Sequence, residues 1–204
     1  MAYASRTGTK RTIEALRDAG WGWMVGPLDH GRGKLHGMPY ALDNGAWPAF
    51  ANNVEWDQMA FEVALSRYGD GADFIVAPDV VAEREQSLDI TRFWLPDLLR
   101  GFPDRRILIA VQDGMEFCDV DPLLDDRVGI FLGGSTEWKE KAIIPWGQWA
   151  AQFGIYCHVG RVNTTRRINL CIAGGCHSFD GTSATRFHTN IAKLDGARRQ
   201  IAML

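Results

Sequence analysis

Residues 107–114 read ILIAVQDG, an apolar run that ends abruptly in a polar turn. Short runs rich in Ile, Val, Phe and Tyr, bounded by Gly, Pro, Asp or Asn, are typical of buried β-strands. The same pattern recurs along the whole chain, which indicates a sheet of many short strands. The predicted strands are residues 21–25, 40–42, 74–77, 107–111, 129–132, 156–159 and 178–179.

Longer segments with a helical pattern separate these strands. Residues 55–68 place Met59, Val63 and Ala64 on one face, which predicts an amphipathic helix. Pro96 and Pro145 fall inside two other helical segments and predict a kink or a break in each. Those further helices are predicted over residues 86–100, 137–153 and 164–173.

Strand–helix alternation of this kind predicts parallel strands joined by crossover helices. A doubly wound nucleotide-binding sheet would need a G-x-G-x-x-G turn after its first strand, and the glycines of residues 31–33 lack that pattern. We therefore predict one compact TIM-like (β/α) barrel domain over residues 1–204, although seven strands leave one of its eight units unaccounted for. Residues 30–37 are the most loop-like stretch, and we expect them to be mobile.

The composition limits the class of protein. The chain has 204 residues, of which 46% are hydrophobic and 23% charged, and this balance excludes disordered, collagen-like and coiled-coil proteins. No stretch approaches the roughly 18 apolar residues of a membrane span. Residues 1–20 lack the apolar core of a signal peptide, so we expect a cytoplasmic protein that binds no membrane.

The four cysteines carry no metal-site or redox spacing, because no pair forms C-x-x-C. Cys157-His158 and Cys176-His177 are adjacent pairs of potential metal ligands. Neighbouring residues on a strand point to opposite faces, however, and do not easily share one ion. We therefore expect free thiols, several of them buried, and no bound metal.

Charge is distributed unevenly along the chain. Residues 51–154 carry nine basic and nineteen acidic side chains, whereas residues 155–204 carry seven basic and two acidic ones. Such asymmetry predicts either a basic face for an anionic partner or an acidic solvated middle with basic helix ends. On the first interpretation, phosphate contacts would come from Arg161, Arg166, Arg167 and Arg186.

Polar side chains follow five of the predicted strands. Three of the strand ends lead into Asp43, Asp79 and Asp180, a fourth into Gln112, and a fifth into the turn Gly133-Gly134. In a parallel α/β barrel these ends all lie at one face, which holds the active site. Any single Asp at such a position is commonly a turn or cap residue, but three together favour catalysis.

Three carboxylates suit chemistry at a glycosidic bond. One carboxylate can attack an anomeric carbon and form a covalent intermediate. A second can carry a proton to and from the leaving group. A third, with an amide and backbone N–H groups, can bind the polar edge of a base, and glycines allow the backbone to approach a flat ligand closely.

The strand ends also resemble a known family, the tRNA-guanine transglycosylase superfamily, which includes phage and bacterial DNA enzymes that insert 7-deazaguanines. The resemblance spans residues 40–186. The matching segments, in order, are 43–47 (DNGAW) for D-S-G-G-F, 111–114 (VQDG) for V-Q-G-G, 133–135 (GGS) for the start of G-G-L-x-V-G-E, 156–160 (YCHVG) for M-G-V-G and 179–186 (FDGTSATR) for F-D-C-V-x-P-T-R.

The resemblance implies roles for the three carboxylates. Asp180 matches the nucleophile that attacks the sugar, and Asp43 matches the general acid/base. Asp79 falls where the family has an Asp that recognises the base. Arg186 matches an Arg associated with the phosphate backbone.

The remaining matches imply substrate contacts. Gln112 and the Gly133-Gly134 turn fall at base-recognition positions. Trp47 stands where the family has a Phe that stacks on the base, and indole can do the same. Asn44 replaces a Ser beside the general acid/base.

The sequence departs from the family in size and in metal content. The family's tRNA enzymes are much longer and carry a C-x-C-x-x-C zinc site with a later His, which is missing here. Asp113 replaces a Gly, so the incoming base is left open. These features favour a zinc-free DNA enzyme, and the expected activity is that of a pentosyltransferase that replaces guanine in DNA, in preference to tRNA, with a 7-deazaguanine through a covalent Asp180 intermediate.

The same resemblance implies no cofactor, a queuosine-related base as co-substrate and, for a phage gene, the host cytoplasm as the location. A homodimer or a partner protein stays open. Two other functions also stay open. One is a hydrolase or transferase on free nucleosides or nucleotides, which the net charge of −3 favours. The other is a non-catalytic barrel that binds nucleic acid or a partner, although such a module would not need Asp43, Asp79 and Asp180 together.

Overall fold

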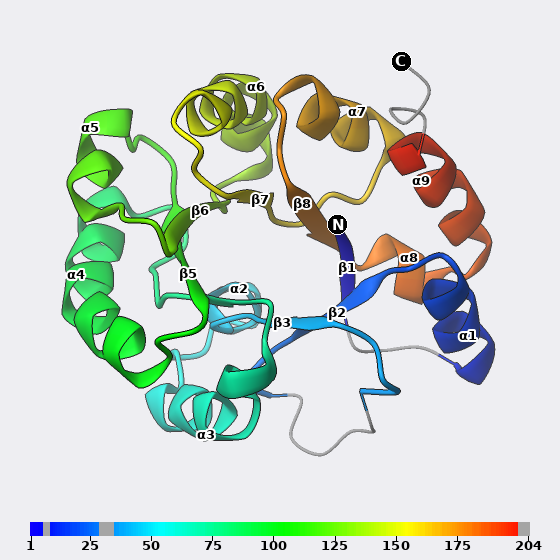
Figure 1. Cartoon of the computed structure of the whole chain (residues 1–204), viewed down its shortest axis with the longest axis horizontal. Coiled ribbons are helices and arrows are strands. Elements are labelled where there is room, and N and C mark those ends of the chain that lie inside the picture. The colour runs from blue at the N-terminus through cyan, green and yellow to red at the C-terminus, as the bar shows by residue number, and fades with distance from the viewer. Residues whose placement is uncertain (6–8, 29–34, 200–204) are drawn as a thin grey trace.

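The computed structural model describes residues 1–5, 9–28 and 35–199. Its parallel strands close into one barrel in chain order, and the last strand is hydrogen-bonded to the first (Figure 1). The predicted compact TIM-like (β/α) barrel is confirmed, with all eight strands present. They are β1 (Ala2–Ser5), β2 (Gly22–Val25), β3 (Tyr40–Leu42), β4 (Phe74–Val76), β5 (Arg106–Val111), β6 (Val128–Leu132), β7 (Cys157–Val159) and β8 (Ser178–Gly181).

Most helices surround the barrel as an outer ring, whereas α2 lies inside the outline of that ring in this view (Figure 1). Arg198, near the C-terminal end of this ring, donates a hydrogen bond to the Ala19 carbonyl after the first helix, which closes the ring. The helices are α1 (Lys10–Asp18), α2 (Ala46–Ala51), α3 (Gln58–Tyr68), α4 (Arg84–Gly101), α5 (Phe117–Val120), α6 (Thr136–Gln152), α7 (Thr165–Ala173), α8 (Ser183–Arg186) and α9 (Thr189–Arg199).

The strand that sequence patterns missed is β1. Its residues Ala2–Ser5 include no β-branched side chain, so it lacks the composition of a strand. Pairing with β2 on one side and β8 on the other places it in the barrel. Ala2 and Ala4 face the helices, while Tyr3 fills the barrel interior.

Two apolar layers result from the alternation of side chains along the strands. The larger layer lies between the barrel and the helices, and the smaller one fills the barrel. Phe74 and Leu108 are fully buried in the interior layer, beside the partly buried Phe131 and Tyr156. The barrel is therefore a packed core, and open space is confined to its ends.

The helix predictions for residues 55–68, 86–100 and 137–153 were wrong in part. In α3 the predicted apolar face is buried only at Ala64, whereas Met59 and Val63 are 75% and 44% exposed, because the helix packs through Ala60 and Phe61 and their neighbours one turn later. Helices α4 and α6 both continue through their prolines, so neither is broken at Pro96 or Pro145, and the kink that was the alternative at Pro96 stays a prediction. Buried apolar residues on both sides of each proline anchor these helices to the barrel.

The four cysteines are free thiols, and Cys157 and Cys171 are buried. Cys157 faces the helices while the adjacent His158 packs on rings inside the barrel, as alternation along a strand requires. The sequence did not predict that Cys157 Sγ lies 3.8 Å from Cys176 Sγ. In the part of the chain that the structure describes, no group of three or more His, Cys, Asp or Glu side chains could hold a metal ion.

Two further predictions concerned a mobile loop at residues 30–37 and the lack of a membrane span. Residues 30–34 of the predicted loop lie outside the described residues. Among the helices that are described, none is both long and apolar enough to cross a membrane.

Candidate active site

A cavity of about 460 Å³ opens at the carboxyl ends of the strands. Segments that follow six strands, β2 to β7, line it together with β8 and the turn after it. This is the face at which a parallel α/β barrel places its ligands. Of the residues singled out in the sequence, Asp43, Asn44, Trp47, Asp79, Gln112, Gly133, Gly134, Arg161, Arg167 and Asp180 line the cavity.

Asp79 is held between two side-chain amides. Asn44 Nδ2 donates to Asp79 Oδ1 at 2.5 Å, and Gln112 Nε2 donates to Asp79 Oδ2 at 2.6 Å. Burial raises the pKa of Asp79 to about 6, against the opposing effects of Asn44 and Arg161. The predicted base-recognition Asp is thus part of a rigid polar frame across β3, β4 and β5.

Gln112 extends that frame to the backbone of the next strand. Its Oε1 accepts hydrogen bonds from the N–H groups of Gly134 and Ala82, each at 2.9 Å. Gly134 has φ +60°, and a Cβ there would lie 2.6 Å from Asp113 Oδ1. Asp113 in turn accepts from the N–H and hydroxyl of Ser135 at 2.5 and 2.6 Å, so it fixes the turn after β6.

Asp43 lies directly after β3 and reaches the cavity wall. Burial raises its pKa to about 7, and the nearby charges of Asp180 and Asp79 act in the same direction. Hydrogen bonds from the backbone N–H groups of Asn44 and Gly45 oppose this shift only in part. A carboxyl group with such a pKa is part protonated at neutral pH, as a general acid must be.

Asp180, on β8, has a different environment from Asp43. His158 Nε2 lies 3.1 Å from Asp180 Oδ2, and the N–H of Arg161 donates to Oδ1 at 3.2 Å. Each oxygen of Asp180 therefore has a hydrogen-bond partner, and one of these partners is a buried imidazole, which Asp43 lacks among the described residues. Two carboxyl groups at one cavity are therefore held in unlike surroundings.

Trp47 and Arg161 form one wall of the cavity. The guanidinium carbon of Arg161 lies 3.6 Å from the centre of the Trp47 ring, in a cation–π contact, and the guanidinium also donates to the Gly134 carbonyl. Arg161 has φ +59°, a conformation that non-glycine residues rarely adopt. The Arg161 guanidinium therefore covers one face of the Trp47 ring that was expected to stack on a base.

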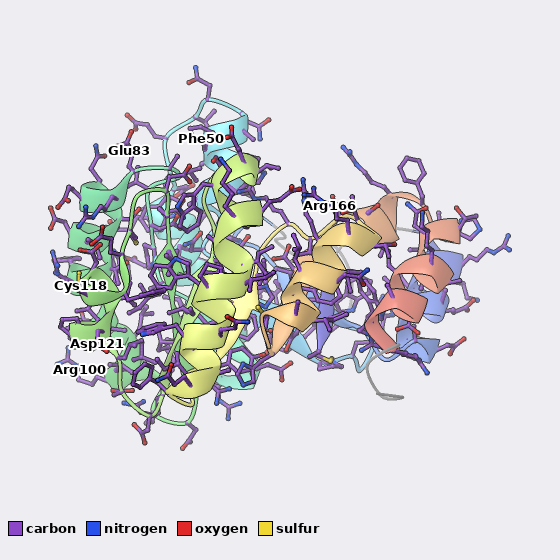
Figure 2. The ribbon with its side chains drawn as sticks, turned by 90° about the horizontal axis from the view of Figure 1, so that it is seen from above. Phe50, Glu83, Arg100, Cys118, Asp121 and Arg166 are labelled. Carbon is purple, nitrogen blue, oxygen red and sulfur yellow. The ribbon has the colours of Figure 1, made fainter. Side chains whose placement is uncertain are left out.

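The other predicted arginines lie in different settings. Arg166 and Arg167 both pair with Glu140, at 2.5 and 2.8 Å, and Arg166 lies at the molecular surface (Figure 2). Arg186, on α8, is exposed. The expected nucleic-acid contact by Arg161, Arg166, Arg167 and Arg186 stays a prediction.

Sequence reasoning gave no role to two buried residues beside this site. His158 is fully buried and contacts Asp180. Lys139 is also fully buried, and its Nζ has no hydrogen-bond partner among the described residues. A His in the middle of a short apolar strand was a usable signal, whereas nothing around Lys139 in the sequence marks its burial.

Comparison with known proteins found no matching protein-family profile and no matching curated protein. Among solved structures, one titled "Native KDPGal structure" matches 100% of this chain and 96% of its own, with 15% sequence identity and a TM-score of 0.55. At this identity the likeness concerns the fold alone.

These findings overturn the predicted membership in the tRNA-guanine transglycosylase superfamily. The match is to a KDPGal structure and not to a transglycosylase, and no family profile supports the assignment. The predictions of guanine exchange, of 7-deazaguanine insertion into DNA and of a phage-type enzyme were therefore wrong. The motifs misled because short Asp-bearing and Gly-rich turns after strands follow from the geometry of any parallel barrel.

Proposed function

We propose that this protein is a hydrolase that cleaves the glycosidic bond of a small sugar-containing molecule. The observation that carries the proposal is the unlike environment of Asp43 and Asp180 at one cavity. Environments that separate the protonation states of two carboxyl groups assign an acid and a nucleophile. A volume of about 460 Å³ suits a small molecule.

The reaction consists of two displacements. The Asp180 carboxylate attacks the anomeric carbon, while Asp43 gives its proton to the leaving oxygen or nitrogen. Asp43, now ionised, takes a proton from a water molecule, and the resulting hydroxide releases the sugar from Asp180. The rigid polar frame of Asp79, Asn44 and Gln112 offers hydrogen bonds to sugar hydroxyls. The wall formed by Trp47 and Arg161 packs on a flat or anionic part of the substrate.

The test is a hydrolysis screen with 4-nitrophenyl glycosides, nucleosides and nucleoside monophosphates. A 2-fluoro sugar analogue of the best substrate, followed by intact-protein mass measurement, should label Asp180 in the wild type and leave the Asp180→Asn protein unlabelled. Asp89→Asn, on the exposed face of α4, is the matched control and should keep full labelling. An Asp180→Asn protein that still hydrolyses the substrate would contradict the proposal.

A lyase that works through a lysine Schiff base is a second candidate. One observation favours it. Burial, helped by the charge of Arg161, lowers the pKa of Lys139 to about 7, which makes its amine nucleophilic. However, Lys139 is not among the described residues that line the cavity. Borohydride reduction in the presence of small aldehydes and keto acids decides between them, because only a Schiff-base enzyme gains a stable adduct on Lys139.

The location of the protein stays a prediction. The proposed location is the cytoplasm. Immunodetection in fractionated cells would test it.

A further inference from the structure

A series of hydrogen-bonded side chains runs through the barrel interior beneath Asp180. The Tyr156 hydroxyl donates to Ser178 Oγ at 2.8 Å, and Ser178 Oγ lies 2.7 Å from His158 Nδ1. His158 Nε2 then lies 3.1 Å from Asp180 Oδ2. These three contacts connect β7, β8 and the residue before β7, and all lie on the interior side of the strands.

The order of donors fixes the tautomer of His158. Asp180, as the ionised nucleophile proposed above, can only accept, so His158 Nε2 carries the ring proton. Ser178 Oγ accepts from Tyr156 and then donates its own hydrogen to His158 Nδ1. Nδ1 is then the acceptor, so the ring proton is on Nε2 and points at Asp180 Oδ2. The partner of one ring nitrogen thus sets what the other nitrogen does.

Aromatic rings hold the imidazole in place. Phe131 stacks on it with ring centres 4.9 Å apart and an interplanar angle of 18°, and Phe74 lies at 4.9 Å. The ring of Tyr3 lies at 5.9 Å, and the imidazole has no exposed surface. Burial lowers the pKa of His158 although Asp180 opposes the shift, which keeps the ring neutral at neutral pH.

We propose that His158 is a positioning residue that orients Asp180 for attack, and that Ser178 and Tyr156 hold His158 in the tautomer that does so. This inference rests on the proposed function of Asp180 as nucleophile. With Oδ2 held by His158 and Oδ1 by the Arg161 N–H, the carboxylate has one fixed plane at the cavity. A nucleophile fixed in this way loses less rotational freedom when it attacks.

The first test needs no activity. The ¹⁵N spectrum of the His-labelled wild-type protein should show His158 as a neutral ring protonated at Nε2. Ser178→Ala should convert it to a mixture of tautomers, and Tyr156→Phe should do so to a smaller extent. Tyr40→Phe is the control, since that hydroxyl donates to the Tyr68 carbonyl instead. A wild-type ring protonated at Nδ1, or one unchanged by Ser178→Ala, overturns the inference.

The second test uses the hydrolysis substrate. Ser178→Ala, which is nearly isosteric and should fold, is expected to lower kcat about 10-fold with KM unchanged, and His158→Phe about 100-fold. His158→Gln keeps an N–H donor and should recover part of the loss. Full kcat in Ser178→Ala together with the predicted wild-type tautomer refutes the positioning role alone. A lack of hydrolysis in every protein refutes the proposed function, while the spectra still decide the hydrogen-bond order.

Discussion

The two ends of this barrel both carry aspartates and arginines, but they differ in the burial and the charge balance of these residues. At the carboxyl end, Asp43, Asp79 and Asp180 share a cavity with Arg161 and Arg167, and Arg167 is already paired with Glu140. At the amino end, a groove of about 230 Å³ is lined by three aspartates and three arginines in equal number: Asp73, Asp104, Asp126, Arg105, Arg106 and Arg127. Figure 2 shows the two ends, with Phe50 and Glu83 toward the first and Arg100 and Asp121 toward the second.

The difference lies in burial and charge balance. At the carboxyl end, buried carboxyl groups with too few cations have raised pKa values, about 7 for Asp43 and about 6 for Asp79. At the amino end, Arg127 donates to the carbonyls of Leu99 and Pro103, which stabilises the end of α4. We infer that the carboxyl end is organised for chemistry and the amino end for stability. Paired substitutions at the two ends test this contrast.

Asp180→Asn should have the largest effect. An amide is a far poorer nucleophile than a carboxylate, so we expect hydrolysis to fall by about 10⁴-fold or more. Stability should fall by only about 1–3 kcal/mol, because the amide has one oxygen where the carboxylate has two, so one of the N–H groups of His158 and Arg161 loses its acceptor. The control at the other end is Asp73→Asn, whose Asp accepts from the Tyr3 hydroxyl at 2.8 Å and which should leave the rate unchanged. Comparable loss in both variants would mean that the two ends do not differ in role.

Asp43→Asn should lower activity and raise stability. Removal of proton transfer typically costs about 10²–10⁴-fold in rate. The folded-state pKa of about 7 lies above the roughly 3.9 of an unfolded Asp, so the folded form holds an extra proton between these values. The contribution of Asp43 to stability is therefore complete below about pH 4 and is lost as pH rises through about 7.

Melting curves measured at pH 5 and pH 8 test that sign. Asp43→Asn should melt at a higher temperature than wild type at pH 8, with a smaller difference at pH 5. Wild-type hydrolysis should also decline above about pH 7, as the acid loses its proton. A variant that is less stable than wild type at pH 8 would show that the Asp43 carboxylate is not strained by its surroundings.

The barrel could be predicted from the sequence because its signal is local. Apolar runs bounded by Gly, Pro, Asp or Asn marked every strand from β2 to β8, and the polar turns after five of them placed Asp43, Gln112 and Gly134 around one cavity. Strand β1 was not predicted, because Ala2–Ser5 contains no β-branched residue. Its place in the barrel comes from pairing with β2 and β8. Local patterns identify elements, whereas pairing across the barrel completes the fold.

The contacts that define the site are not local, and the sequence did not reveal them. His158 meets Asp180 across 22 positions of sequence, and Asn44 meets Asp79 across 35. The family assignment failed for the opposite reason. It relied on short turn motifs, which barrel geometry imposes on proteins of unrelated function.

Gly134→Ala should have a smaller effect, and mainly on stability. A methyl group there would lie 2.6 Å from both Asp113 Oδ1 and the Trp138 ring, at a φ of +60°. We expect a loss of about 1–3 kcal/mol in the free energy of unfolding, measured by urea denaturation. Gly196→Ala in α9 is the control, because a Cβ there meets nothing within 4 Å and alanine favours a helix. Equal stability in the two variants would show that the turn after β6 is not held rigidly by Gln112 and Asp113.

Arg127→Ala at the amino end should have the smallest effect, and on stability only. The variant loses two hydrogen bonds of 3.1 Å to the carbonyls of Leu99 and Pro103, where a cation also interacts favourably with the helix dipole. Because the side chain is only half buried, water replaces part of what is lost, and we expect a cost of about 1 kcal/mol. For a chain of this size that corresponds to a fall in Tm of about 2–4 °C. The kcat and KM for hydrolysis should stay at wild-type values, since this groove and the catalytic cavity lie at opposite ends of a packed core. A change in kcat without a change in Tm would show that the amino end communicates with the chemistry, and the contrast between the two ends would then have to be abandoned.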